Sequence, residues 1–500
     1  MHNESLTRFA RMAALVLGLG LVTLRFVRLE ADPDTSLSMS RVFYTDEGYN
    51  SCNALNKSIT GHWLCDRNNH ILLMPVMPVV QHVFFKLLGL SLASARLPAA
   101  ILSVGAMALM LLMVRRRMRE GRRSAQEEGV TLVLALFLLG TNYYFFVYGR
   151  LALLDLPMTA FGLASLLVFH RALAVPQGKR AWWHVAAAGM LLGVAFLAKP
   201  SAALYGTALL VLGLIQAIVE PRAWRQWTTK VFGALLVAAV VVGVVRCGLW
   251  LVAAGYRDLT PTHLISDRIT VHLRTILRNY VKFFNNPVVR RNWELLLLAY
   301  FNVVLIAFYA ARNGVFRLAD RVMISYLIAC YVFLGFFVHQ LPRYFVVLVI
   351  PVTYLVATLP VNVGLVFGPR RGAKMRVAAV MLILMANWWN VVRLVNYHRE
   401  PAYSLRMVAQ QVKERVMANG VSHGGDAILC GDVAATLALA NGMRFSFDVH
   451  HGVQGQYLLA QGEAALPGYK LTPIGTFDLL GNYYCYDYGS RRMHLYRVQE

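Results

Sequence analysis

The feature that most constrains the fold is a series of eleven apolar runs, each about as long as a helix that crosses a membrane. A helix of roughly 17 to 25 apolar residues spans the hydrocarbon core of a bilayer. Composition agrees, since 58% of the 500 residues are hydrophobic and only 15% are charged. The sequence therefore predicts an α-helical polytopic membrane protein. The runs fall at about 12–30, 93–114, 129–148, 156–174, 184–198, 202–219, 231–254, 294–311, 322–338, 345–367 and 376–395.

Basic residues gather in alternate connections between these runs. The chain has 49 Lys and Arg against 25 Asp and Glu, a balance that in a soluble protein would raise nucleic-acid binding. The alternation follows the positive-inside rule instead, so we expect these connections to be cytoplasmic and expect no nucleic-acid partner. The expected location is a bacterial inner (plasma) membrane, with the other connections and the C-terminal part on the periplasmic side. The basic connections are 115–123, 171–180, 221–230, 311–321 and 369–376.

Near residue 396 the composition changes to that of a small globular domain. We expect residues 1–395 to form the transmembrane domain, with outer loops at 31–92 and 255–293, and residues 396–500 to form an extracytoplasmic α/β domain. SLRMVAQQVKERVMANG has helical spacing and ends on a glycine, whereas DAILCG, NYYCYDYG and RRMHLYRV have the character of strands.

Four of the six cysteines lie in segments predicted to be extracytoplasmic. Cys52 and Cys65 belong to the first outer loop, and Cys430 and Cys485 belong to the C-terminal domain. An oxidising compartment permits a disulfide in each pair, and free thiols are the alternative. Because Cys430 and Cys485 both fall in strand-like segments of one small domain, we expect them to lie close enough to bridge.

Two adjacent acids, Asp46 and Glu47, stand in the stretch YTDEGYN of the first outer loop. Such acids are usually solvated surface residues or helix N-caps. Ionisable residues also follow the third, fifth and ninth apolar runs, at the outer membrane level, where a charge is costly and tends to mark a site. These residues are Arg150, Asp155, Lys199 and Arg343, the last with Tyr344 beside it.

A carboxylate that faces several cations at one membrane depth suits chemistry on a phosphate-bearing lipid. The cations hold a phosphate as it becomes a leaving group, and the carboxylate takes the proton of an acceptor hydroxyl. The pattern therefore predicts a transferase that acts on a lipid-linked phosphate.

The outer segment 255–293 is rich in arginine although it lies on the outer side. Apolar residues recur between the arginines at near-helical spacing, which predicts an amphipathic helix on the membrane surface. The helix could anchor the protein to lipid headgroups. The alternative is a clamp for a donor or acceptor phosphate, for which Arg268 and Arg274 are the candidates.

Several motifs follow one another in order between about residues 40 and 350. They are YTDEGY, NHILLMPVMP, GLSLASARLPAAI, RLALLD, LAKPSA and LPRYFVVLVIP. In this order the sequence resembles the GT-C superfamily of membrane glycosyltransferases. Within that superfamily it is most similar to the group that contains protein O-mannosyltransferases and the aminoarabinose transferase of lipid A.

The resemblance implies a GT-C-like fold and the transfer of a monosaccharide, with inversion, from a polyprenyl-phosphate donor at the outer face of the membrane. Asp46 matches the catalytic aspartate of the first loop, and Glu47 matches the acid beside it. We expect Asp46 to be the general base and Glu47 to support it. The other matches are Asp155 with the acid after the third span, Lys199 with the lysine that meets the donor phosphate, and Arg343 and Tyr344 with the Arg-Tyr pair before the tenth span.

His70 fits the resemblance less well. The family often has His-Pro-Pro or Lys-Pro-Pro in the first loop, whereas Ile-Leu-Leu-Met separates His70 from Pro75. A lone histidine in a loop is more often structural or exposed. Some relatives bind a divalent metal near this point, so the cofactor stays open, with His70 and Asp155 as candidate ligands. The sequence shows no complete ligand set.

The acceptor also stays open. It is a hydroxyl or phosphate of an envelope glycolipid or polysaccharide, or a protein hydroxyl as in the O-mannosyltransferase type. The basic outer segment favours an anionic glycolipid over a protein, and membrane lipids are further expected partners. A lipid flippase or transporter is the alternative from another class, but such proteins often have corresponding halves with broken helices, and the sequence has no such repeat.

Overall fold

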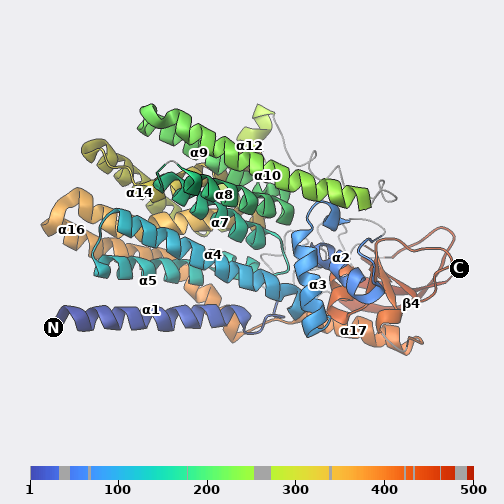
Figure 1. Cartoon of the computed structure of the whole chain (residues 1–500). Helices are drawn as coiled ribbons and strands as arrows, with labels where there is room; N and C mark the ends of the chain where they lie inside the picture. The colour runs from blue at the N-terminus through green and yellow to red at the C-terminus, as the bar shows by residue number, and fades with distance from the viewer. Residues whose placement is uncertain are drawn as a thin grey trace.

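The computed structural model describes residues 2–32, 46–65, 69–176, 178–252, 272–336, 341–421, 424–431, 434–461, 463–478 and 492–499. The protein is a bundle of long helices with a small mixed β-sheet at one end (Figure 1). We call the end of the bundle that carries the sheet the sheet end, and the other end the distal end. The predicted fold class, a helical membrane protein with a small C-terminal α/β region, is confirmed.

The helices of the bundle follow one another with short connections. They are α1 (His2–Phe26), α2 (Glu47–Thr60), η3 (His70–Leu72), α3 (Val76–Leu88), α4 (Leu92–Glu120), α5 (Ala125–Thr141), α6 (Tyr143–Tyr148), α7 (Asp155–Ala174), α8 (Lys179–Ala198), η4 (Pro200–Ala202), α9 (Ala203–Val219), η5 (Pro221–Ala223), α10 (Trp224–Val252), α12 (Leu273–Asn285), α13 (Pro287–Arg290), α14 (Trp293–Asn313), α15 (Leu318–Phe336), η7 (Pro342–Phe345) and α16 (Val346–Arg399).

Nine helical segments of the described residues are long and apolar enough to cross a membrane. All eleven predicted runs are largely helical, but the first and third fall short of that criterion. The apolar part of α1 covers only Leu15–Phe26, and α5 has 17 residues before Asn142 interrupts it. The backbone of Asn142 is not helical, and its side chain accepts a hydrogen bond from Phe145 N at the start of α6, which explains why the helix restarts there.

The longest helix, α16, contains two of the predicted spans. Gly368 in its middle has a φ of 74°, a left-handed conformation that glycine adopts easily. A Cβ on Gly372 would lie 3.0 Å from the Cα of Gly364, although eight residues of straight helix would separate them by about 12 Å. The chain therefore folds back at Gly368 into two antiparallel halves.

The C-terminal region follows α16. It contains α17 (Ser404–Ala418), η8 (Gly424–Asp426), β1 (Ile428–Cys430), α18 (Ala435–Asn441), β2 (Arg444–Ser446), β3 (Gln456–Gln461), β4 (Lys470–Asp478) and β5 (Arg492–Gln499). The sheet has the order β2-β1-β3-β5-β4, in which β1 is parallel to β2 and β3, and β5 is antiparallel to β3 and β4. The predictions for α17, β1 and β5 agree with this structure. The strand expected at NYYCYDYG lies outside the described residues, and the boundary at residue 396 stays a prediction.

The amphipathic helix expected in the second outer loop is present in its described part as α12. One face of α12 carries the buried side chains of Asn279 and Phe283. The opposite face exposes apolar residues, Leu273, Leu277 and Val281 among them. The helix therefore has the two-sided character that its spacing predicts.

Candidate active site

Four of the predicted charged residues lie at helix ends that meet at the sheet end of the bundle. Asp46 directly precedes α2, and Asp155 is the first residue of α7. Lys199 follows the last residue of α8, and Arg343 belongs to η7. Helix N-termini favour carboxylates and helix C-termini favour cations, so both acids and the lysine occupy ends of matching sign.

Asp46 and Arg343 form an ion pair between an Oδ2 atom and an Nη1 atom. Arg343 also donates from Nη2 to the hydroxyl of Tyr344 at 3.2 Å. The guanidinium carbon lies 5.1 Å from the centroid of the Tyr344 ring. The first outer loop is thus joined to the turn that begins the tenth predicted span.

Lys199 continues this chain of contacts. Its Nζ donates to Asp155 Oδ1 at 2.5 Å and lies 4.7 Å from the centroid of the Tyr344 ring. Tyr344 is therefore shared by two cations, each of which is paired with a carboxylate. We call these five residues the charge cluster: Asp46, Arg343, Tyr344, Lys199 and Asp155.

Prolines shape the two turns that present the cations. Pro200 follows Lys199, and a residue before proline avoids the helical conformation. Lys199 accordingly has an extended backbone, with φ of −161° and ψ of 129°, at the end of α8. Pro342 begins η7, where its fixed φ and missing N–H carry no cost.

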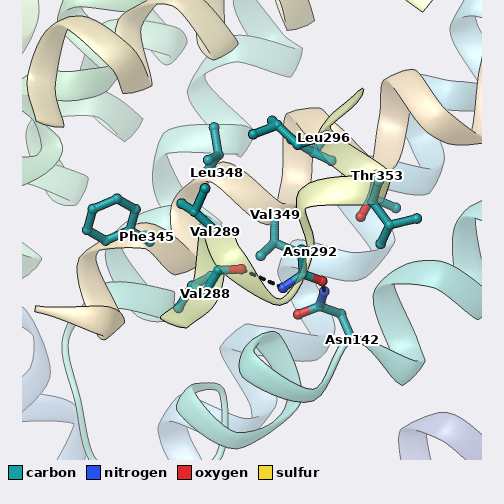
Figure 2. A pocket seen from close by; sticks show the side chains of 11 residues that line it. Asn142, Val288, Val289, Asn292, Leu296, Phe345, Leu348, Val349 and Thr353 are labelled. Carbon is teal, nitrogen blue, oxygen red and sulfur yellow. Dashed lines mark hydrogen bonds between the residues drawn. The ribbon is translucent and has the colours of Figure 1, made fainter. Parts of the chain in front are cut away.

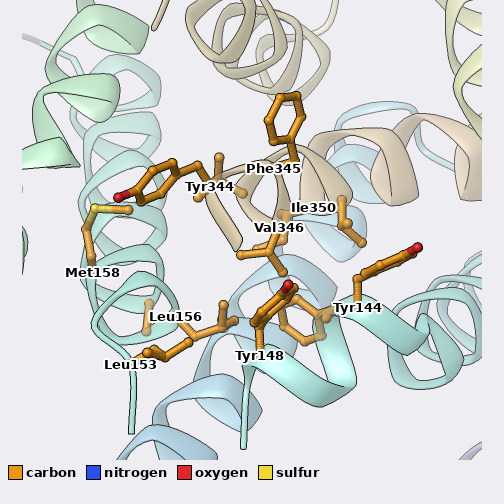
Figure 3. Packing of buried hydrophobic residues seen from close by; sticks show 14 of the residues in the cluster. Tyr144, Tyr148, Leu153, Leu156, Met158, Tyr344, Phe345, Val346 and Ile350 are labelled. Carbon is orange, nitrogen blue, oxygen red and sulfur yellow. The ribbon is translucent and has the colours of Figure 1, made fainter. Parts of the chain in front are cut away.

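Access to the charge cluster is uneven. The side chain of Asp46 is 23% exposed, whereas that of Asp155 is 4% exposed. Tyr344 is buried, and its side chain extends toward Met158 of α7 (Figure 3). Of the two carboxylates, Asp46 is therefore the more accessible to a substrate.

Glu47 lies in a separate, fully buried ion pair. Arg96 of α4 contacts it through two parallel hydrogen bonds, from Nε to Oε1 at 2.9 Å and from Nη2 to Oε2 at 2.7 Å. Both side chains are 0% exposed. Ala152 N also donates to Oε1 at 2.7 Å. With both oxygens bonded away from solvent, Glu47 fixes the first outer loop to α4 and to the turn before α7.

Arg150 does not join the charge cluster. It donates from Nη2 to the carbonyl oxygens of Val27 at 2.7 Å and Arg28 at 2.5 Å. Its guanidinium also lies 5.1 Å from the ring centroid of Tyr397. Burial is the main cause that lowers the pKa of Arg150 below its ordinary value, and the nearby Arg96 adds to it. Its contacts are those of a residue that fastens the end of α1.

The structure does not assemble a metal site from the predicted ligands. His70 begins η3, and its carbonyl oxygen accepts hydrogen bonds from Leu73 N and Met74 N. The described residues contain no group of three or more His, Cys, Asp or Glu that could hold a metal ion. We therefore derive no step through a metal.

The remaining predicted residues divide between described and masked segments of the sequence. Arg274 is exposed on α12, whereas Arg268 and Cys485 lie outside the described residues, so the proposed Cys430–Cys485 bridge stays a prediction. Cys52 is a free thiol whose Sγ contacts Tyr49 O at 3.2 Å. No disulfide therefore joins it to Cys65 in this structure.

A small cavity lies behind the turn that holds Arg343. Its volume is about 20 Å³, which is room for about one water molecule. Figure 2 shows Asn142 and Asn292 beside it, joined by a hydrogen bond of 3.0 Å, and Asn292 donating to Val288 O at 2.7 Å. These bonds hold α13 and α14 against α5 and support η7 from below.

Sequence reasoning missed the residues that hold Asp46 in place. Arg96 stands in the quoted motif GLSLASARLPAAI, and a lone arginine at the start of an apolar helix was a signal that it needs an acid partner. Gly48 gave no such signal. Its N–H donates to Thr436 Oγ1 of α18 at 3.1 Å, and a Cβ on it would lie 2.3 Å from the backbone of α18. The helix that begins after Asp46 is therefore seated directly on the C-terminal region.

Replacing Gly48 by alanine should lower stability by about 1 to 3 kcal/mol, because the added methyl group meets backbone that cannot move aside. Sugar transfer should also fall in the folded fraction, since α2 and Asp46 must shift together. Thermal unfolding and transfer assays in detergent measure the two effects. Gly105→Ala on α4 is the matched control, because open space surrounds its Cβ position. Equal stability and transfer in the two variants would contradict the seating of α2 on α18.

The fold and the charge cluster together define a class of protein. A multi-pass bundle of this architecture, with acids and cations gathered at one end, has the fold of the GT-C membrane glycosyltransferases, and the resemblance predicted from the sequence is confirmed. Residues 74–250 match the family model described as dolichyl-phosphate-mannose-protein mannosyltransferase. A search of curated proteins finds no match.

Solved structures support the same fold. ArnT from Cupriavidus metallidurans in the apo state aligns with a TM-score of 0.61 at 14% identity, over 97% of this chain and 98% of that one. The same protein bound to undecaprenyl phosphate aligns with a TM-score of 0.58 at 14% identity, over 96% and 97%. The apo oligosaccharyltransferase of Archaeoglobus fulgidus gives 0.54 at 12% identity, over 90% of this chain and 69% of that one.

Proposed function

We propose that the protein is an inverting glycosyltransferase that moves a monosaccharide from a polyprenyl-phosphate donor to an envelope glycolipid or polysaccharide. The observation that carries this proposal is the charge cluster. It brings an accessible carboxylate, Asp46, within one ion pair of Arg343 and, through Tyr344, close to Lys199. These are the groups that acid-base chemistry at a phosphate leaving group needs.

The proposed reaction is a single displacement at the anomeric carbon of the sugar. The acceptor oxygen forms a bond to that carbon while the bond from the carbon to the phosphate oxygen breaks. The proton of the acceptor hydroxyl passes to Asp46, and the bonding electrons leave with the polyprenyl phosphate. Lys199 and Arg343 neutralise the charge that develops on that phosphate.

The pairing of Asp46 with Arg343 gives the donor a second effect. A carboxylate paired with a guanidinium is a weaker base, because the cation favours its charged form. A donor phosphate competes for Arg343 and so releases Asp46 when both substrates are bound. The proposed base is therefore most active only when there is a phosphate to expel.

The relatives agree with a lipid phosphate donor. One of the ArnT structures is described as bound to undecaprenyl phosphate. The oligosaccharyltransferase AglB from Archaeoglobus fulgidus is described in complex with an inhibitory peptide and a dolichol-phosphate. We propose a polyprenyl monophosphate for this chain on the same ground.

The acceptor and the orientation are proposed from charge. The exposed basic residues Arg274, Arg278 and Lys282 on α12 lie beside its exposed apolar stripe, an arrangement that suits an anionic glycolipid in the membrane surface. The positive-inside rule places the charge cluster and the C-terminal region on the periplasmic face of a bacterial inner membrane.

A transfer assay tests the proposed function. The purified protein is incubated with a set of polyprenyl-monophosphate sugars and an extract of envelope glycolipids, and labelled sugar is followed into the acceptor fraction. We expect transfer from at least one donor, with inverted configuration in the product. Movement of lipid across vesicles without any transfer would support a flippase and overturn the proposal.

Replacing Lys199 by alanine should raise the KM for the donor about 10- to 100-fold, the equivalent of losing one charged hydrogen bond to phosphate. Because this change also leaves Asp155 buried without its lysine, the pair Lys199→Ala and Asp155→Asn is compared with it by thermal unfolding. Lys86→Ala, which removes an exposed lysine of α3, is the control. An unchanged donor KM in a folded Lys199→Ala protein would remove Lys199 from the phosphate site.

A further inference from the structure

A groove with a basic rim lies between α4 and α7 at the distal end of the bundle. Its volume is about 390 Å³. Arginines dominate its lining, and apolar side chains form the rest. The residues that matter are Arg115, Arg116, Arg119 and Arg171 on the rim and Leu112 and Leu167 below them.

The spacing along the two helices explains the groove. Leu112, Arg116 and Arg119 follow each other at four and three residues on α4, so they share one face of that helix. Leu167 and Arg171 are four residues apart on α7 and share a face as well. Both helices therefore run from an apolar residue to a basic one in the same direction, toward the distal end.

Two of the arginines are committed to the protein. Arg115 Nε pairs with Glu128 Oε1 at 3.1 Å. Arg116 donates from Nη1 to Leu167 O at 2.6 Å, which bridges the two helices at the floor of the groove. These contacts fix its shape.

The other two arginines, Arg119 and Arg171, are exposed. Within the described part of the chain, neither forms an ion pair with an acid. Two guanidinium groups above an apolar floor therefore have charge available for an anion. Guanidinium groups bind phosphate oxygens in pairs, which suits them to a phosphodiester.

The position of the groove along α4 identifies the source of such an anion. Arg96, which pairs with Glu47 at the sheet end, precedes Arg116 by about 20 residues of one helix, or about 30 Å. That length is the thickness of the hydrocarbon core of a bilayer. The groove thus lies at the membrane interface opposite the charge cluster, where lipid headgroups are present.

We propose that this groove binds an anionic glycerophospholipid of the phosphatidylglycerol type. Its phosphodiester contacts Arg119 and Arg171, and an acyl chain lies along Leu112 and Leu167. This lipid holds the distal ends of α4 and α7 together, on the side of the membrane away from the proposed reaction.

The test compares lipid binding by the full chain and by two variants in detergent, with native mass spectrometry and thermal unfolding as readouts. The groove variant is Arg119→Gln/Arg171→Gln. The control, Arg312→Gln/Arg370→Gln, removes two exposed arginines outside the groove. The probes are phosphatidylglycerol, phosphatidylcholine and inorganic phosphate.

The wild type and the control should retain phosphatidylglycerol in preference to phosphatidylcholine and gain thermal stability from it. The groove variant should bind phosphatidylglycerol about thirtyfold more weakly, or about 1 kcal/mol for each arginine lost. Equal phosphatidylglycerol binding by the groove variant and the control would overturn the proposal. So would equal stabilisation of the wild type by phosphatidylcholine or by inorganic phosphate.

Discussion

Replacing Asp46 by asparagine should reduce sugar transfer by about 10²- to 10⁴-fold, the loss typical of a general base. Asparagine keeps the shape of the side chain but cannot take the acceptor proton. It also frees Arg343 from its ion pair, so the donor should bind at least as tightly as in the wild type. A steady-state assay with varied donor should therefore show a large fall in kcat and an unchanged or lower KM.

Glu463→Gln is a suitable control for this experiment, because it removes an exposed carboxylate from the C-terminal region and should leave kcat unchanged. If Asp46→Asn kept near-normal kcat, the base would be another group. If it instead raised the donor KM with kcat unchanged, Asp46 would act in donor binding rather than in proton transfer.

Replacing Glu47 by glutamine should destabilise the folded protein by about 3 to 5 kcal/mol. The change leaves the positive charge of Arg96 buried at 0% exposure without its carboxylate. Glu47 also accepts the hydrogen bond from Ala152 N, so the turn before α7 loses an anchor. Thermal unfolding of purified protein in detergent should show a marked drop in the melting temperature.

The double variant Glu47→Gln/Arg96→Met separates this structural role from catalysis. Removing both charges avoids the uncompensated buried cation, so the double variant should recover much of the lost stability. Measurable transfer in the recovered protein would agree with a supporting role for Glu47. A Glu47→Gln protein of wild-type stability that lacked transfer would instead make Glu47 a catalytic group.

The membrane helices and most of the charge cluster could be predicted from the sequence because each depends on local information. Hydropathy locates the helices, and the alternation of basic connections assigns helix ends to common levels. Asp155, Lys199 and Arg343 each stand at such an end. Residues at one level of a compact bundle lie close together, which is why the prediction placed them in one group.

Membrane level alone does not determine the direction of a side chain. Arg150 was predicted at the same level, yet it bonds to the carbonyl groups that end α1. The pairing of Glu47 with Arg96 joins residues 49 positions apart, and no local pattern specifies such a partner. Short or irregular strands were missed for another reason: β2 has three residues, and β4 contains Pro473 and Gly475, which weaken a strand pattern.

The central claim is that the charge cluster binds the phosphate of a lipid-linked sugar. The most direct measurement is an electron cryo-microscopy structure of the purified protein with a polyprenyl monophosphate. We predict phosphate density within hydrogen-bond distance, about 3 Å, of Lys199 Nζ or the Arg343 guanidinium, with the ion pair between Arg343 and Asp46 opened. Phosphate density away from both cations, with that ion pair intact, would contradict the account.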